Sequence, residues 1–301
     1  MLTIVSKRLA DSIGSAHAIA LLTVVLWSLT FVQTKVLLIH LSPVEILLDR
    51  FVIAWILFWI VFPRTVSTSW HEEIIFALLG ATGIFGYYIL ENLALERTQA
   101  IHVGLIVTTA PLFTTAITLV SRPFSPPLLR ATIGGFIPVS AGLYLMSHDR
   151  LSDLGYGDLL ALLGALSFAI YSILLARVSG RFDGRIVTRK SFFYGVLFLC
   201  LYAAATGESF HWAAYRLAPV WSNLLLLALI ASGLCFLMWR WTVTRIGSSA
   251  ATAYIYLVPL INALAAVWVL GEEMSTRIIL AGALILGGLI LSQRHIALQN
   301  R

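Results

Sequence analysis

Ionisable side chains interrupt several long apolar stretches of this chain, and they are the groups that could do chemistry there. Glu45, Asp49 and Arg50 share one stretch, Lys35 precedes them, and Glu91 lies in another. An unpaired charge at the centre of a bilayer costs about 2.5–3.5 kcal/mol, so such residues pair or serve a function. One interpretation is a salt-bridge network in which Lys35 and Arg50 compensate the two carboxylates. The other is a gate, or a carboxylate that takes up and releases protons, with Glu91 the first candidate and Asp49 the second.

The composition indicates that the apolar stretches around these charges form membrane helices. The 301 residues are 59% hydrophobic and 11% charged, and the mean hydropathy is +0.93. The apolar runs reach about 20 residues, which is the length that crosses a bilayer as a helix. Cys200 and Cys235 both fall inside apolar runs, so a disulfide framework is not expected.

Ten apolar spans are predicted, joined by short connections with proline and glycine turns. They cover residues 17–38, 44–62, 74–95, 101–120, 129–147, 158–178, 187–206, 222–243, 250–270 and 277–293. The first span follows Lys7 and Arg8 and could imitate a signal peptide, but we interpret it as a retained helix because similar runs follow it. The fold class is therefore an all-α membrane protein with residues 1–301 in a single membrane domain.

Basic residues orient the spans. With the amino terminus inside, 14 of the 20 lysines and arginines fall on inner loops and ends and 4 on outer loops. Because cytoplasmic loops carry the excess of basic residues, we expect both termini in the cytoplasm. The same rule and anionic lipid explain the basic loop 177–190 better than a nucleic-acid site does, despite the net charge of +6.

Two segments of the chain repeat one another 148 residues apart. Arg97 and a turn of small residues precede an apolar run to Pro111, and Arg245 and a similar turn precede an apolar run to Pro259. The repeats extend over residues 17–147 and 158–293, and each contains five spans. Because five is odd, the halves must cross the membrane in opposite directions, which is typical of inverted-repeat transporters with a central site at their interface.

A depth estimate places four landmarks near the middle of the membrane. At about 1.5 Å per residue, Trp27, Pro111, Phe168 and Pro259 each lie roughly 14–15 Å from the start of their helices. Each proline leaves a carbonyl without its helical donor, so a kink is expected there. The freed carbonyl either faces a hydrated cavity or is satisfied by a neighbouring helix.

Polar and aromatic side chains at helical spacing from these landmarks define the predicted substrate site. They are Trp27, Thr30, Gln33, Thr108, Pro111, Thr115, Phe168, Tyr171, Trp239, Tyr256, Pro259 and Asn262. An aromatic wall suits substrates with apolar or cationic groups. Each threonine can instead bond a carbonyl of its own helix, and Trp27 can be a packing residue rather than a cavity wall.

Several motifs taken in order resemble the drug/metabolite transporter superfamily, in its ten-helix EamA branch, over residues 17–293. They are Trp27-x-x-x-Phe31, Pro43 with Arg50, Ala94-Leu95-x-x-Thr98-x-Ala100 leading to Pro111, the second copy leading to Pro259, Leu270-Gly271-Glu272-Glu273, and Gly282-Ala283-Leu284-Ile285-Leu286-Gly287-Gly288. Ser28 and Glu91 depart from the family's usual residues.

The resemblance implies a bundle with a central cavity in the bacterial inner membrane, walled by helices 1, 3, 4, 6, 8 and 9. It also implies export of metabolites, amino acids or toxic compounds from the cytoplasm. The leading expectation is an amino-acid exporter, and the alternative is an exporter of aromatic or cationic drugs. We expect no cofactor and no metal, and the expected partners are a small-molecule substrate, the lipid bilayer and a second copy of the chain.

Non-transport functions have less support in the sequence. An intramembrane enzyme would need a nucleophile with its base, or a metal site, at one depth, and the chain has neither GxSxG nor HExxH. A receptor that binds ligand without moving it would share the composition of a transporter. A P-loop for ATP is also missing from the sequence.

Overall fold

The computed structural model describes residues 2–121, 126–147, 155–178, 181–246 and 254–297, and every regular element within these ranges is helical. The α-helices are α1 (Leu2–Leu37), α2 (Pro43–Val61), α3 (Trp70–Leu79), α4 (Tyr87–Arg97), α5 (Ala100–Val107), α6 (Ala110–Ser121), α7 (Pro126–Ser147), α8 (Tyr156–Val178), α9 (Gly184–Thr206), α10 (Ala218–Leu225), α11 (Cys235–Ile246), α13 (Val258–Ala265) and α14 (Thr276–Ala297). The π-helical segments are η1 (Gly80–Gly86), η4 (Leu226–Leu234) and η6 (Ala266–Leu270), and the 3-10 turns are η3 (Ala214–Arg216) and η5 (Tyr254–Leu257).

Within the described ranges these elements, apart from the 3-10 turn η3, form ten helical rods. In chain order the rods are α1, α2, α3–η1–α4, α5–α6, α7, α8, α9, α10–η4–α11, η5–α13–η6 and α14. Every predicted span overlaps one rod, and the boundaries of most differ by only a few residues. The first four residues of the predicted span 250–270 lie outside the described residues.

Apolar length is the property that makes these rods candidates for membrane crossing. Among the described residues, six helices are long and apolar enough to span a bilayer, and three shorter apolar helices accompany them. α2 is not among the six, although it has 19 residues, because it carries Glu45, Asp49 and Arg50. Three of the ionisable residues within apolar stretches therefore share one rod, α2, whereas Lys35 lies in α1 and Glu91 in α4.

Irregular backbone marks the middle of several rods. α5 ends at Val107 and α6 begins at Ala110, so the fourth rod is interrupted just before Pro111. The ninth rod changes from a 3-10 turn to an α-helix just before Pro259. Both interruptions lie where the two prolines predict a kink. The π-helical turns of the third and eighth rods were not expected from the sequence.

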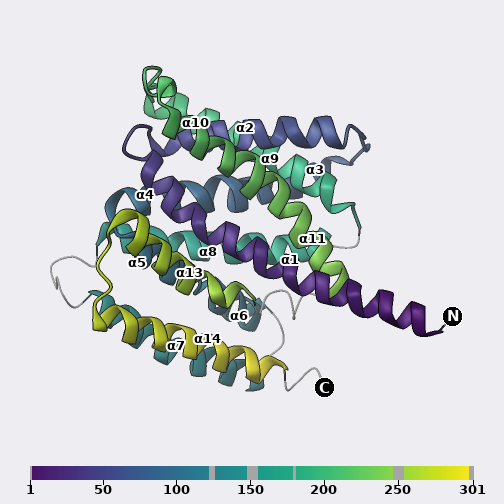
Figure 1. The fold of residues 1–301 in the computed structure, drawn as a ribbon, viewed down its shortest axis with the longest axis vertical. Coiled ribbons are helices and arrows are strands. Elements are labelled where there is room, and N and C mark those ends of the chain that lie inside the picture. The colour runs from purple at the N-terminus through teal and green to yellow at the C-terminus, as the bar shows by residue number, and fades with distance from the viewer. Residues whose placement is uncertain (1, 122–125, 148–154, 179–180, 247–253, 298–301) are drawn as a thin grey trace.

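The rods pack in a regular set of pairs. α7 lies along α14, and Figure 1 shows this pair side by side at one edge of the bundle. The third rod packs on the sixth and seventh, and the eighth packs on the first and second. The fourth rod contacts the sixth and ninth, the first contacts the ninth, and the second contacts the seventh. One apolar core surrounds α5 and α13, and another lies between α2 and α9.

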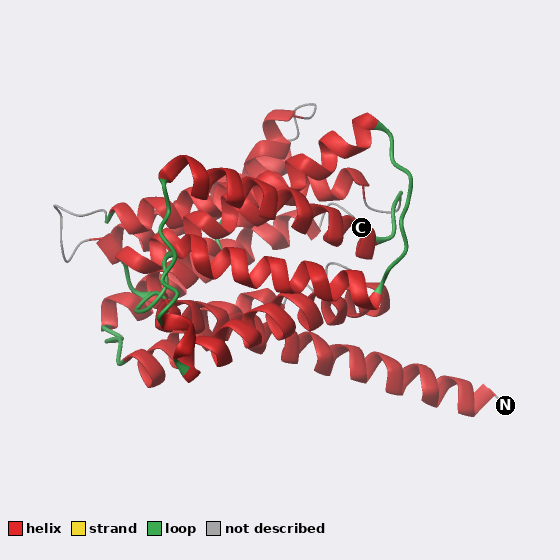
Figure 2. Ribbon diagram, turned by 90° about the horizontal axis from the view of Figure 1, so that it is seen from above, coloured by secondary structure: helices red, strands yellow, loops and turns green. Residues whose placement is uncertain are grey.

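Alternate rods turn back at opposite ends of the bundle. The start of α1 and the end of α14 lie at one end, called here the terminal end (Figure 1). The loops after α1, α4 and η6 lie at the opposite, distal end. Figure 2 shows the first part of α1 extending well beyond the other helices at the terminal end. The described beginning of α1 and the described end of α14 thus lie at the same end of the bundle, and the side of the membrane that they face stays a prediction.

Glycines allow α7 and α14 to approach closely. A Cβ atom built on Gly288 would lie 2.7 Å from the Pro138 ring and 2.8 Å from the Gly135 carbonyl oxygen. A Cβ atom on the neighbouring Gly287 would meet nothing within 4 Å. Of these two adjacent glycines in the family-like motif, only Gly288 therefore serves packing inside the monomer.

Replacing Gly288 with alanine is expected to lower the free energy of unfolding by about 1–3 kcal/mol, because backbone and a proline ring must move to admit the methyl group. Gly287→Ala is the matched control and should be neutral or slightly stabilising, since alanine favours the helix. Thermal unfolding of both variants in the same detergent tests this. Equal melting temperatures for the two variants would contradict the proposed packing.

Candidate functional site

An aromatic cluster joins the first and eighth rods. The ring centroids of Trp27 and Trp239 are 5.2 Å apart, and those of Trp27 and Phe236 are 5.9 Å apart. The indole Nε1 of Trp27 donates a hydrogen bond to the Ala231 carbonyl oxygen at 3.1 Å, and that carbonyl belongs to the π-helical η4. The structure thus brings two predicted substrate residues together, and it gives Trp27 packing partners on the opposite half of the chain.

The predicted threonines bond to their own helices. The hydroxyls of Thr30, Thr108 and Thr115 donate to the carbonyl oxygens of Trp27, Leu105 and Pro111, at distances of 2.6–2.8 Å. These bonds are the local alternative that the sequence left open. Each hydroxyl oxygen keeps its acceptor capacity, but its proton is already used inside the helix.

Asn262 joins the fourth and ninth rods, which carry the two prolines. Its Nδ2 donates to the Ala100 carbonyl oxygen at 2.7 Å, and its Oδ1 is buried with no hydrogen-bond partner among the described residues. Gly104 makes room for this amide, because a Cβ there would lie 2.1 Å from Nδ2. The predicted importance of a buried amide is consistent with this placement, although one half of the amide holds the bundle together.

The other predicted substrate residues are dispersed. Phe168 is 37% exposed, with its ring 5.1 Å from that of Tyr87 and 5.7 Å from that of Tyr171. Tyr171 packs against Gly83, where a Cβ would lie 2.2 Å from the tyrosine ring. None of these rings contacts Trp27 directly in the described structure. Of the rest, Pro259 is buried, Gln33 and Pro111 are partly buried, and the side chain of Tyr256 lies outside the described residues.

Arg50 lies in α2 and is buried, with 1% of its surface exposed. Its Nε donates to the Ser232 hydroxyl oxygen at 2.7 Å, and Ser232 lies on η4. The guanidinium carbon is 4.6 Å from the ring centroid of Tyr88 and 5.2 Å from that of Phe51. Its Nη1 has no hydrogen-bond partner among the described residues.

Glu91 is the second charged residue at this place and is also 1% exposed. The hydroxyl of Tyr87, one helical turn earlier, and the guanidinium of Arg50 are its electrostatic neighbours. Its Oε2 is buried with no hydrogen-bond partner among the described residues. Arg50 and Glu91, the pair that we name the buried charge pair, thus combine a free donor with a free acceptor.

The predicted salt-bridge network of the second rod is wrong. No ion pair of 4.0 Å or less joins Lys35 or Arg50 to Glu45 or Asp49 in the described structure. Lys35 donates instead to the carbonyl oxygens of Leu95 (2.6 Å) and Thr98, at the end of α4. A lysine is favourable there because helix carboxyl ends carry unpaired carbonyls and a partial negative charge.

The two carboxylates of the second rod bind the segment before α10, an arrangement that we name the distal latch. Glu45 accepts from the backbone nitrogen and the Nδ1 of His211, at 2.5 and 2.7 Å. Asp49 accepts from the Tyr215 hydroxyl at 2.7 Å. Burial, and after it the hydrogen bond to Asp49, raises the pKa of the Tyr215 hydroxyl, so this group stays a proton donor well above neutral pH.

A corresponding set of contacts, the terminal latch, lies at the other end of the bundle. Glu73 on α3 accepts from the Tyr194 hydroxyl at 2.6 Å and also from Lys190 and Thr68. Arg189, also on α9, donates to the carbonyl oxygen of Phe62 at 2.7 Å. Sequence reasoning missed this latch because its residues looked like an ordinary basic loop.

Glu272 was visible only as part of the family-like motif. Its two carboxylate oxygens accept from the backbone nitrogens of Ala100 and Ile101, at 2.7 and 3.0 Å. These are the first amides of α5, so the carboxylate caps a helix amino end that carries a partial positive charge. Lys35 and Glu272 together hold the turn between the third and fourth rods.

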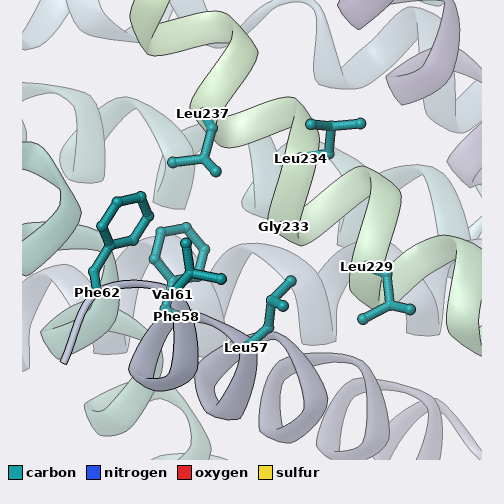
Figure 3. Close-up of a pocket in the computed structure, with 8 residues that line it drawn as sticks. All are labelled: Leu57, Phe58, Val61, Phe62, Leu229, Gly233, Leu234 and Leu237. Atoms are coloured by element: carbon teal, nitrogen blue, oxygen red, sulfur yellow. The ribbon is translucent and has the colours of Figure 1, made fainter.

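Two small cavities lie outside the predicted substrate site. One of about 120 Å³ opens between α2 and the eighth rod, and Figure 3 shows its apolar side chains facing each other across it. Its lining is Leu57, Phe58, Val61, Phe62, Leu229, Gly233, Leu234 and Leu237. The other, of about 150 Å³, adjoins Lys35 and Glu96. No cluster of three histidine, cysteine or acidic residues suited to a metal occurs in the described residues.

The chain is similar in sequence to known transporters and in fold to a solved structure. The chain is 25% identical over 292 residues to an "Uncharacterized transporter" of Archaeoglobus fulgidus, covering 93% of this chain and 97% of the relative. It is 26% identical over 282 residues to a "Probable terminal-alkyne amino-acid exporter" of Streptantibioticus cattleyicolor, covering 91% and 92%. A crystal structure titled only as that of a protein shares the fold, with a TM-score of 0.62 at 17% identity over 93% of this chain and 98% of that one.

The family match covers nearly the whole chain and occurs twice. The EamA-like transporter family matches residues 14–147 and again residues 155–293. The division of the chain into two inverted repeats at residues 17–147 and 158–293 stays a prediction. A transporter rather than an enzyme is therefore indicated, and the apolar helices agree with a multi-pass membrane protein. The chain belongs to the EamA-like transporter family.

Proposed function

We propose that this protein is a secondary active transporter that exports small metabolites, amino acids foremost, across the bacterial inner membrane by alternating access. In this proposal the ten rods cross the membrane as two inverted five-helix repeats with both termini in the cytoplasm. The terminal end of the bundle then faces the cytoplasm, and the distal end faces outwards. The substrate binds between the repeats, beside Trp27, Trp239 and the buried charge pair.

The symmetry of the rod pairings is the observation that carries the proposal. Each rod of the first half has an equivalent five places later in the second half, so rods 1 and 6, 2 and 7, and 3 and 8 are equivalent. When equivalent rods are exchanged, the contact between rods 3 and 6 becomes the contact between rods 8 and 1. In the same way, the contact between rods 3 and 7 becomes the contact between rods 8 and 2, and all four contacts are present. The pairs 5–10, 4–9 and 2–7 map onto themselves. Such an exchange is what a twofold axis between two repeats produces, and in inverted repeats the substrate site lies on that axis.

The two latches also join equivalent pairs of rods in the two halves of the chain. The distal latch joins the second rod to the segment before the eighth, and the terminal latch joins the seventh rod to the start of the third. One latch therefore sits at each end of the bundle, between equivalent pairs of rods. Alternating access needs an obstruction on each side that can be released separately, and these contacts meet that requirement.

The choice of amino acids rests on the site and on one relative. The aromatic cluster at Trp27 adjoins, through Phe236 and Phe192, the rings that cover Arg50. A site with apolar walls and a few polar groups suits a small organic molecule. The relative from Streptantibioticus cattleyicolor is named as an amino-acid exporter. The second candidate is export of aromatic or cationic drugs, which the aromatic cluster favours.

The proposal is tested by reconstituting the purified chain in proteoliposomes. Uptake of the twenty radiolabelled amino acids and of the cationic dye ethidium is measured with an imposed pH gradient and after its collapse by nigericin. We expect uptake of at least one amino acid that exceeds that of protein-free liposomes and falls when the gradient collapses. Gradient-driven uptake of ethidium alone would favour drug export. Absence of flux for the whole panel would refute transport of these substrates.

A further inference from the structure

We propose that the buried charge pair binds the two charged ends of a zwitterionic α-amino acid, and that a proton competes with the substrate's ammonium group for Glu91. In this arrangement the substrate carboxylate binds Arg50 and the ammonium group binds Glu91. The inference rests on the proposed transport function and deepens it, because it names the substrate class, the residues and the coupling.

Both members of the buried charge pair have a polar atom without a hydrogen-bond partner among the described residues. Nη1 of Arg50 and Oε2 of Glu91 are both fully buried and unpartnered in the described structure. A buried polar atom without a partner costs about 1–3 kcal/mol, and more when the group is charged. Native proteins leave few such atoms, and those that remain call for an explanation. A ligand that supplies one acceptor and one donor would satisfy both.

The second step is the separation of the two charges. Arg50 and Glu91 interact electrostatically, yet no nitrogen–oxygen distance between them falls within the 4.0 Å of an ion pair. Other contacts fix the arginine away from direct pairing, namely the bond to Ser232 and the stacking on Tyr88. An α-amino acid carries its carboxylate and its ammonium group on one carbon, so it presents the complementary pair of charges side by side.

The third step is the row of apolar rings that packs beside the pair, in which Phe51 and Phe192 are fully buried. Phe51 contacts Phe192 with ring centroids 5.3 Å apart, and Phe192 contacts Phe236 at 5.6 Å. Phe236 in turn contacts Trp27. This row of rings leads from Arg50 to the predicted substrate residues, so the favoured amino acids have apolar or aromatic side chains. The row also explains how Arg50 and Trp27 serve one site although they do not touch.

The fourth step is the backbone around the pair. Ser232 lies within η4, and Tyr87 directly follows η1, so a π-helical turn flanks the pair on each half of the chain. Such turns occur frequently at functional sites. Because the pair is enclosed in this structure, substrate entry requires the third or the eighth rod to move, and these turns are where both rods are irregular.

Proton coupling follows from the sign of the charges. Ionised Glu91 attracts the substrate's ammonium group, whereas protonated Glu91 does not, so proton and substrate bind alternately and move in opposite directions. The titratable and charged groups around Glu91 are Arg50 from α2 and Tyr87 and Tyr88 from its own helix. Cys235 of α11 interacts electrostatically with Arg50, and Tyr171 of α8 interacts in the same way with Tyr88. An inward proton gradient would then drive export of the amino acid.

The inference is tested first on the unmodified protein. L-Phenylalanine is added to the purified full chain in a weakly buffered solution from pH 5 to pH 8, with a pH-sensitive dye present. We expect saturable binding with proton release at the acidic end of this range. Phenethylamine, which lacks the carboxylate, and 3-phenylpropionate, which lacks the ammonium group, should each bind about 10-fold more weakly or worse. Binding of L-phenylalanine without proton release at any pH would overturn the inference.

Glu91→Gln provides the second test, with Glu96→Gln on the same helix as the matched control. Glu96 is an exposed carboxylate beside Arg97. Both variants are reconstituted, and uptake of L-phenylalanine is driven by a vesicle interior more acidic than the outside. We expect Glu91→Gln to lose the acceleration by the pH gradient, about 10-fold or more, and Glu96→Gln to retain it. Retained acceleration in Glu91→Gln would overturn the inference.

The outcomes separate this inference from the proposed function. Gradient-driven transport of ethidium by a protein that neither binds nor moves L-phenylalanine would overturn the inference and leave the transporter proposal standing. A Glu91→Gln protein that fails to fold does not remove the test, because proton release is measured on the unmodified chain. Absence of flux for every compound counts against the proposed function itself.

Discussion

Replacing Arg50 alone with leucine is expected to destabilise the protein by about 3–5 kcal/mol and to abolish amino-acid transport. The physical reason is that Glu91 would remain buried without its compensating charge, and removal of one member of a buried pair is strongly destabilising. The bond to Ser232 and the stacking on Tyr88 would be lost as well. Chemical unfolding in mixed micelles measures the stability, and proteoliposome uptake measures the transport.

The double variant Arg50→Leu with Glu91→Leu separates folding from function. Replacing both members of a buried charge pair by apolar residues is often neutral or stabilising, so the double variant should recover most of the stability. Transport should not recover, because neither end of the substrate would have a partner. A double variant that transports L-phenylalanine as well as the unmodified protein would show that the pair only supports the fold.

Breaking one latch is expected to expose the centre of the protein to one side of the membrane. Glu73→Gln weakens the bonds from Tyr194 and Lys190 at the terminal end, and Tyr215→Phe removes the bond to Asp49 at the distal end. Hydrogen bonds to charged groups contribute about 1.5–3 kcal/mol each, so either change should shift the populations of the two states by roughly 10–100-fold.

Cys235 offers a native reporter for this prediction. It is buried beside Arg50, and Cys200 is the only other cysteine in the chain. In a Cys200→Ala background, we expect Glu73→Gln to increase labelling of Cys235 by an impermeant maleimide in inside-out vesicles. Tyr215→Phe should increase labelling in right-side-out vesicles. Equal labelling from both sides in both variants would contradict the assignment of the latches.

Helix positions were predictable because hydrophobicity is a property of the local sequence. The predicted span 44–62 corresponds to α2 at Pro43–Val61, and the predicted 158–178 corresponds to α8 at Tyr156–Val178. The mid-helix interruptions before Pro111 and Pro259 were predictable for the same reason, since proline lacks an amide donor wherever it stands.

Side-chain pairing was less predictable, because it depends on how each helix is rotated against its neighbours. One interpretation paired Lys35 with the carboxylates of α2, yet Lys35 donates to the carbonyls at the end of α4, and Asp49 accepts from Tyr215. Ser232 carried no signal in an apolar run, although it fixes Arg50. Phe168 shared a predicted depth with Trp27 but contacts Tyr87 and Tyr171 instead, since depth along a helix does not determine its direction.

The π-helical turns in the third and eighth rods give the two parts of each rod separate angular settings. A regular α-helix advances 100° per residue, so the directions of all its side chains are fixed once one is fixed. The wider π-helical turn at Gly80–Gly86 has a different rotation per residue. It lets α3 pack against α9 while α4 packs against α8. If the same seven residues formed a regular α-helix, the angle between α3 and α4 would change, and with it the direction in which Glu91 points relative to the contacts of α3. In the proposed site, the direction of Glu91 thus depends on the backbone at this turn as well as on the residues that line the site.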